Sequence, residues 1–214
     1  MLGRITWLVG RLTEAAASVV GLRAGTEEPR YALEAKVHGL EIRRYDPRTA
    51  AETVVEGARE RALREAFRRL AGYIFGANHD NSKIAMTAPV SQQQDEINGG
   101  QLIAMTAPVA QEAGPDESWV IRFFMPAKWT LDTLPAPDDD AVKIVAVPAA
   151  TFAVLRFTGA RGPRSVASRT DELLRSLLDT EFQPAGASAA WFYDPPWTVP
   201  YLRRNEVAVP VTKR

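Results

Sequence analysis

The chain has 214 residues, of which 46% are hydrophobic and 24% charged, proportions typical of a soluble globular protein rather than a disordered or membrane-spanning one. Its 26 Lys and Arg residues balance its 26 Asp and Glu residues, so it has no general attraction for nucleic acid, and we expect no nucleic-acid partner. It contains no cysteine and two histidines, which excludes disulfides, thiolate nucleophiles and Cys-rich or His-rich metal sites.

The N-terminal residues 1–30 form a segment of their own. Their apolar residues recur with the spacing of an amphipathic helix, but Arg11 and Glu14 interrupt the stripe. No apolar run is therefore long enough for a membrane span or for the centre of a signal peptide. We expect a helix followed by a polar linker, with residues 5–20 able to make weak contact with a membrane surface, in a cytoplasmic protein.

Residues 31–214 form the expected globular domain, which begins with strands and a helix. Alternation of apolar and polar residues predicts strands at Leu33–Val37, Leu40–Tyr45 and Ala51–Val55, with a turn at His38-Gly39. The clearest helix follows at Ala58–Ile74, where apolar residues line one face and arginines decorate the flanks. Gly76 and the asparagines after it predict where the helix stops.

The heptapeptide IAMTAPV occurs twice, at Ile84–Val90 and Ile103–Val109. Each copy predicts a short strand, with Met86 and Met105 as core residues. The polar sequence SQQQDEINGGQ between them predicts a loop, so we expect the two strands to pair as a hairpin. A further strand is expected at Trp119–Met125.

The second half of the domain has the layout of the first. Strands are predicted at Val142–Val147, Thr151–Phe157 and Glu206–Val211, and a helix at Ser165–Phe182. A shift of 102 residues aligns Glu41–Gly57 with Lys143–Gly159 without a gap. Two strand–strand–helix–strand (ββαβ-like) halves, at about 31–130 and 140–214, predict a duplicated α+β fold with two helices on a curved antiparallel sheet.

The motifs of the common enzyme classes are absent, and we expect no enzymatic activity. Asp138–Asp140 and His79 are interpreted as surface-loop residues, and no metal site is predicted. Glu206 lies on the opposite face of its strand from Val207 and Val209. It is therefore a solvent-facing carboxylate or, if that face lines a cleft, an anchor for a cationic ligand; the first interpretation is favoured.

The helix at Ala58–Ile74 carries the most suggestive pattern. Arg61, Arg64 and Arg68 are spaced three and four apart, so they share a flank beside the apolar face. An apolar face bordered by arginines suits a flat hydrophobic ligand with carboxylates, because a guanidinium group can form two parallel hydrogen bonds with one carboxylate. An ordinary amphipathic helix with solvated arginines is the alternative, and composition alone favours it.

Four segments resemble motifs of the SOUL haem-binding family. They are KIAMTAPV at Lys83–Val90, LEIRRY at Leu40–Tyr45, ALREA at Ala62–Ala66, and YDPP with RRNEV between Tyr193 and Val207. They occur in the family's order and extend over nearly the whole domain. The resemblance implies a distorted antiparallel β-barrel of two duplicated halves with two flanking helices, which agrees with the repeat.

The resemblance also implies non-covalent binding of haem or a related tetrapyrrole, as buffer, carrier or sensor, in a shallow hydrophobic groove beside the first helix. Arg64 matches a family arginine proposed to contact a haem propionate. The expected binding residues are Arg64, Phe67, Arg68, Leu70 and Ala71. A proposed axial histidine of some members is replaced by Arg44, which cannot ordinarily ligate iron. Two family lysines are also missing, at Gly72 and near Thr198.

Two other functions stay open. The same fold resembles the effector-binding domains of bacterial multidrug-response regulators, which implies a pocket for amphipathic cations built from Glu206 and the aromatic residues Trp191–Tyr193. A protein-interaction module without a small ligand is the other alternative.

Overall fold

The computed structural model describes residues 26–94, 118–195 and 197–214. The expected N-terminal helix and the second IAMTAPV copy lie outside these residues. The strands are β1 (Tyr31–Val37), β2 (Leu40–Tyr45), β3 (Arg48–Glu56), β4 (Val90–Gln94), β5 (Ser118–Phe124), β6 (Lys143–Val147), β7 (Ala150–Phe157), β8 (Phe182–Pro184), β9 (Ala189–Phe192) and β10 (Asn205–Lys213). The helices are α2 (Arg59–Ile74), α3 (Pro163–Leu177) and a short 3-10 helix, η2 (Pro200–Leu202). None of the described helices is long and apolar enough to cross a membrane.

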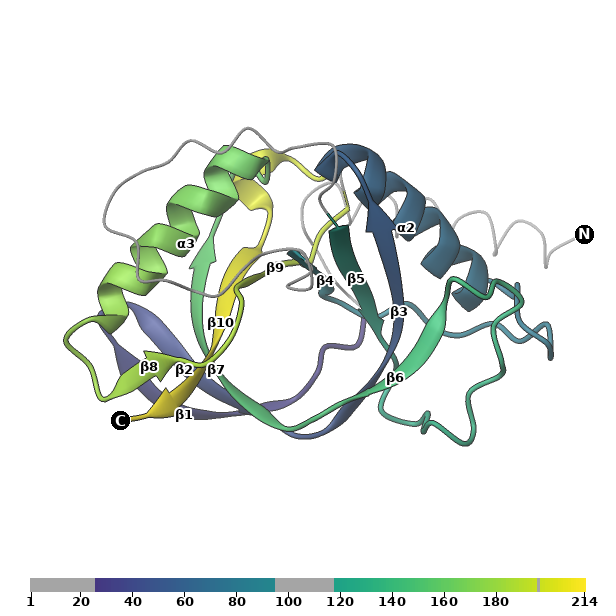
Figure 1. The fold of residues 1–214 in the computed structure, drawn as a ribbon, viewed down its shortest axis with the longest axis horizontal. Coiled ribbons are helices and arrows are strands. Elements are labelled where there is room, and N and C mark those ends of the chain that lie inside the picture. The colour runs from purple at the N-terminus through teal and green to yellow at the C-terminus, as the bar shows by residue number, and fades with distance from the viewer. Residues whose placement is uncertain (1–25, 95–117, 196) are drawn as a thin grey trace, which may run out of the picture.

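The strands form one antiparallel sheet in the order β1-β2-β7-β10-β9-β4-β5-β3-β6, and β8 pairs with β10. The sheet curls into a half-barrel, with α3 outside one half and α2 outside the other (Figure 1). The predicted α+β fold, a distorted antiparallel barrel with two flanking helices, is confirmed.

The strand registers reproduce the internal repeat residue by residue. In the β2–β7 pair Ile42 lies opposite Ala153, and in the β3–β6 pair Ile144 lies opposite Ala51. The 102-residue shift carries Ile42 to Ile144 and Ala51 to Ala153, so each pair is the image of the other. The order of the sheet is accordingly symmetric about the β4–β9 pair, apart from the additional β1 at one edge. Gly57 and Gly159 correspond too, with φ angles of 105° and 95° that favour glycine.

Each helix covers the outer face of its own half. The buried face of α2 consists of Ala62, Ala66, Leu70, Tyr73 and Ile74, which pack against apolar residues of β3, β5 and β6. Helix α3 buries Leu173 and Leu177 against β2, β7 and β10. Because side chains alternate along a strand, the residues between these core positions point to the opposite, inner face of the sheet. Tyr45, Trp191 and Ala208 are buried there in a third cluster.

The first IAMTAPV copy is not the strand that we expected. Within Ile84–Pro89 only Thr87 forms a bridge, and strand β4 begins at Val90 and continues through residues predicted as loop. The amide of Ile84 donates instead to the carbonyl of Ile74, which fastens this segment to the end of α2. Met86, expected in the core, is 42% exposed as a result.

Helix α3 ends at Leu177, five residues before the predicted end. Thr180 stops it: the hydroxyl donates to the carbonyl of Leu177 and accepts the amide of Phe182, at 2.9 and 3.2 Å. This turn brings Phe182, which is 2% exposed, into the core at the start of β8.

Candidate functional site

The outward flank of α2 brings together four of the five predicted binding residues. Arg64, Phe67 and Arg68 are exposed, and Ala71 is half-buried between them and the end of the helix. The Phe67 side chain is 46% exposed, and its ring packs edge-on against Phe123 with 5.4 Å between centroids. The flank therefore combines an apolar surface, in which Phe67 is fixed by its contact with Phe123, with two guanidinium groups.

Leu70, the fifth predicted residue, does not lie on this surface. It is fully buried and packs in the core between α2 and the sheet. Any ligand on the flank would rest on Phe67 and Ala71, while Leu70 supports the helix from beneath.

The arginines of α2 differ in whether they have partners. Arg69 pairs with Glu65 at 2.5 Å and with Asp139 at 4.0 Å. Arg64 and Arg68 form no hydrogen bond or ion pair with any residue that the structure describes. No described residue therefore occupies the donors of these two guanidinium groups beside Phe67, which can bind an anion.

A cavity of about 190 Å³ adjoins the C-terminal part of this flank. Its lining includes Arg68, Arg69, Gly72, Tyr73 and Asp139. Gly72 contributes no side chain to this wall. The hydroxyl of Tyr73 donates to the carbonyl of Pro135 at 2.9 Å, and burial raises the pKa of Tyr73 to about 12. The tyrosine is thus a fixed, neutral part of the wall.

The residues considered as iron ligands are distributed over the molecule. Arg44, at the family's proposed histidine position, pairs with Glu34 of β1 at 3.3 Å and lies in the half covered by α3. His38 is also there, with Nδ1 3.2 Å from the carbonyl oxygen of Ser176. His79 follows α2 in an exposed loop, as predicted, and lies 3.9 Å from Asp138. The structure thus separates Arg44 and His38 from the flank of α2.

Glu206 is fully buried on the inner face, and the expectation of a solvent-facing carboxylate is wrong. Its Oε1 accepts from Arg43 Nη2 at 3.1 Å and Arg204 Nε at 2.9 Å. Its Oε2 accepts from Arg43 Nη1 at 2.8 Å and the Tyr193 hydroxyl at 2.7 Å. Burial alone would raise the pKa of this carboxyl, but the hydrogen bonds and charges of the two arginines and the tyrosine lower it overall.

This network leaves Glu206 without capacity for a cationic ligand. A carboxylate offers about four acceptor positions, and all four are filled by the protein's own donors. Trp191 and Tyr193, the aromatic residues of the cation-pocket alternative, are 2% and 8% exposed. The inner face is closed at this point, so the geometry does not support that alternative.

Comparison with known proteins identifies a family and relatives that match most of the chain. The family model described as SOUL heme-binding protein matches residues 26–210. Heme-binding protein 1 of Bos taurus is 29% identical over 148 residues, which are 69% of this chain and 70% of the relative. The Sus scrofa protein of the same name is 28% identical over the same length.

Solved structures share the fold at low sequence identity. The C-terminal domain of EcmrR superposes with a TM-score of 0.56 and 10% identity, over 88% of this chain and all of that one. An uncharacterized conserved protein from Listeria innocua also has a TM-score of 0.56, with 12% identity over 88% of this chain and 94% of its own. These similarities concern the architecture alone.

Proposed function

The chain belongs to the SOUL heme-binding protein family, and from this we propose that it binds haem or a related tetrapyrrole without a covalent bond. The observation that supports this function best is the flank of α2, where half-exposed Phe67 lies beside Arg64 and Arg68, which have no partner among the described residues. We propose binding, as buffer, carrier or sensor, rather than catalysis.

The residues on the flank fit the chemistry of such a ligand. A tetrapyrrole is flat and apolar and carries carboxylates at its edge, so it needs an apolar platform with cations beside it. Phe67 and Ala71 supply the platform, and Arg64 and Arg68 can each bind one carboxylate in a fork. The Arg–carboxylate contacts require no rearrangement of existing ion pairs, because neither arginine has one among the described residues.

Replacing the two arginines separately tests this assignment. Arg64→Ala and Arg68→Ala should each weaken hemin binding by roughly tenfold, since a charge-assisted contact contributes about 1.5–3 kcal/mol when well formed. Hemin is titrated into the purified proteins while the Soret band is followed. Arg164→Ala, which removes an exposed arginine at the start of α3, is the matched control and should bind hemin as the wild type does. Equal affinities for all four proteins would contradict a site on this flank.

The spectrum of the complex provides a second test. His38 lies in the other half of the molecule, and His79 stands in the exposed loop after α2 with its Nε2 3.9 Å from Asp138, so we expect ferric haem on α2 to lack a strong histidine ligand from the protein. His38→Ala and His79→Ala should therefore leave the absorption spectrum of the hemin complex unchanged. A six-coordinate low-spin spectrum that disappears in either variant would show that a histidine binds the iron.

A further inference from the structure

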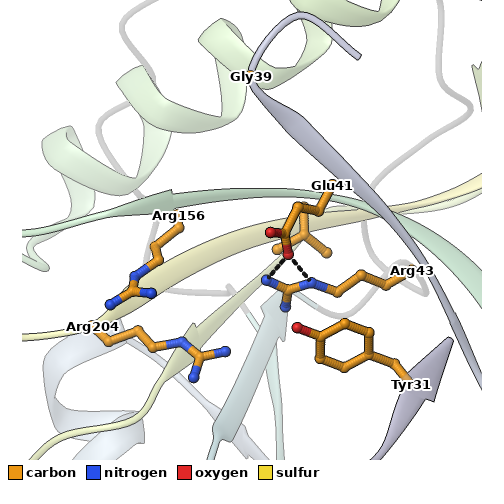
Figure 2. A pocket seen from close by; sticks show the side chains of 7 residues that line it. Tyr31, Gly39, Glu41, Arg43, Arg156 and Arg204 are labelled. Atoms are coloured by element: carbon orange, nitrogen blue, oxygen red, sulfur yellow. Dashed lines mark hydrogen bonds and ion pairs between the residues drawn. The ribbon is translucent and has the colours of Figure 1, made fainter. Parts of the chain in front are cut away.

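A second cavity, of about 200 Å³, lies on the inner face of the sheet, away from α2. We call it the arginine pocket; its walls include Tyr31, Gly39, Glu41, Arg43, Arg156 and Arg204. Figure 2 shows Arg156 and Arg204 on one side of it and Tyr31, Glu41 and Arg43 on the other. Pockets for drug-sized ligands have about 300 Å³ or more, so this cavity suits a smaller molecule than a tetrapyrrole.

The walls of the arginine pocket are fixed by contacts within the protein. The Arg43 side chain is 3% exposed and held by Glu41 and Glu206. Arg204 stacks on the ring of Tyr193, with its guanidinium carbon 3.8 Å from the centroid, and hydrogen-bonds to Glu206. A ligand would therefore enter a site that is already ordered, which removes much of the entropic cost of binding.

All but one of the charges around the arginine pocket are compensated. Glu206 is saturated by Arg43 and Arg204, as described above. Glu28 pairs with Arg204 at 2.9 Å, and Glu41 pairs with Arg43 at 2.7 Å and with Lys36 at 3.9 Å.

Arg156 is the exception. It lies opposite Glu206 in the β7–β10 register and is exposed, but it has no hydrogen bond or ion pair with any described residue. In the part of the chain that the structure describes, one positive charge at the edge of the pocket therefore has no partner. Gly39 lies in the wall of the pocket, and the space beside it is open, because a Cβ at that position would meet no atom within 4 Å.

We propose that the arginine pocket is a second binding site, for a small monocarboxylate whose carboxylate pairs with Arg156. A single uncompensated cation matches a single negative charge, and Glu41 in the wall disfavours a dianion. Tyr31 is 41% exposed and its ring stacks on the Arg43 guanidinium at 4.5 Å, so it offers the ligand its hydroxyl and the remaining aromatic surface. This site is independent of the proposed tetrapyrrole site on α2.

Titration of the full chain with benzoate, followed by NMR on the arginine Nε–Hε signals, tests the proposal. We expect saturable shifts at Arg156. Arg156→Gln should weaken benzoate binding by roughly tenfold or more, whereas the exposed-arginine control Arg164→Gln should not change it. Glu41→Gln should strengthen binding, because it removes the negative charge from the wall. Inorganic phosphate should bind more weakly than benzoate.

Three results would overturn the proposal. These are an unchanged benzoate affinity in a folded Arg156→Gln variant, an equal loss in Arg164→Gln, or tighter binding of phosphate than of benzoate. Hemin titration of Arg156→Gln separates the two sites, because its hemin affinity should equal that of the wild type even if benzoate binding is lost.

Discussion

Glu206→Gln is expected to lower the free energy of unfolding by about 3–5 kcal/mol, the cost of breaking a buried ion pair by removing one partner. The substitution keeps the size of the side chain but removes the fully buried carboxylate that Arg43 and Arg204 share, which leaves Arg43 with the partly exposed Glu41 and Arg204 with Glu28. Arg43 is 3% exposed and Arg204 13%, so water reaches neither guanidinium freely. Urea denaturation followed by circular dichroism measures the loss.

The exposed pair of Glu181 and Lys213 provides the matched control for this substitution. The two side chains are 61% and 64% exposed and lie 3.2 Å apart. Water screens such a pair, so Glu181→Gln should cost less than about 1 kcal/mol. A Glu206→Gln variant as stable as the wild type would show that the network contributes nothing to stability.

The same network should make stability depend on pH in a defined direction. The pKa of Glu206 is lowered in the folded protein from its ordinary value of 4.5. Its contribution is therefore complete above about pH 4.5 and is lost as the pH falls through the folded-state pKa. The stability difference between wild type and Glu206→Gln should accordingly be largest near neutral pH and shrink in acid.

The alternation of apolar and polar residues predicted the fold well, because the same alternation occurs in both halves of the chain. The 102-residue shift, visible in the sequence, carries Ile42 and Ala51 onto Ile144 and Ala153, and the structure pairs these residues in matching registers. The alternation of apolar and polar residues along a strand shows which side chains share a face of the sheet. It does not show whether the polar face is exposed to solvent or covered by other parts of the protein. The interpretation of Glu206 as solvent-facing is wrong for this reason, since its main partner Arg43 lies 163 residues away in the chain.

The candidate site was predictable only in part, because helical periodicity has limited angular resolution. Phe67 and Leu70 are three positions apart, which separates them by about 60° around the helix. Both belong to one apolar stripe in the sequence, yet Leu70 is fully buried while Phe67 is 46% exposed. The boundary between core and surface falls between them, and only the packing of α2 on β3 and β5 determines it.

Substitution of these two residues by alanine should therefore have opposite consequences. Leu70→Ala removes a fully buried side chain from the core and should lower the free energy of unfolding by about 2–5 kcal/mol, while the hemin affinity of the folded protein stays within about twofold of the wild type. Phe67→Ala should cost less than about 1.5 kcal/mol, because nearly half of the residue is already exposed to water.

The loss of hemin affinity should follow the opposite order and be larger for Phe67→Ala than for Leu70→Ala. Phe67→Ala removes the platform on which we propose that the tetrapyrrole rests, so it should weaken hemin binding by roughly threefold to tenfold. Both variants are compared by urea denaturation and by Soret titration, at a temperature where circular dichroism shows that Leu70→Ala is folded. If Leu70→Ala kept its stability but lost hemin binding, the side chain would face a ligand rather than the core. If Phe67→Ala bound hemin like the wild type, the flank of α2 would not be the binding surface.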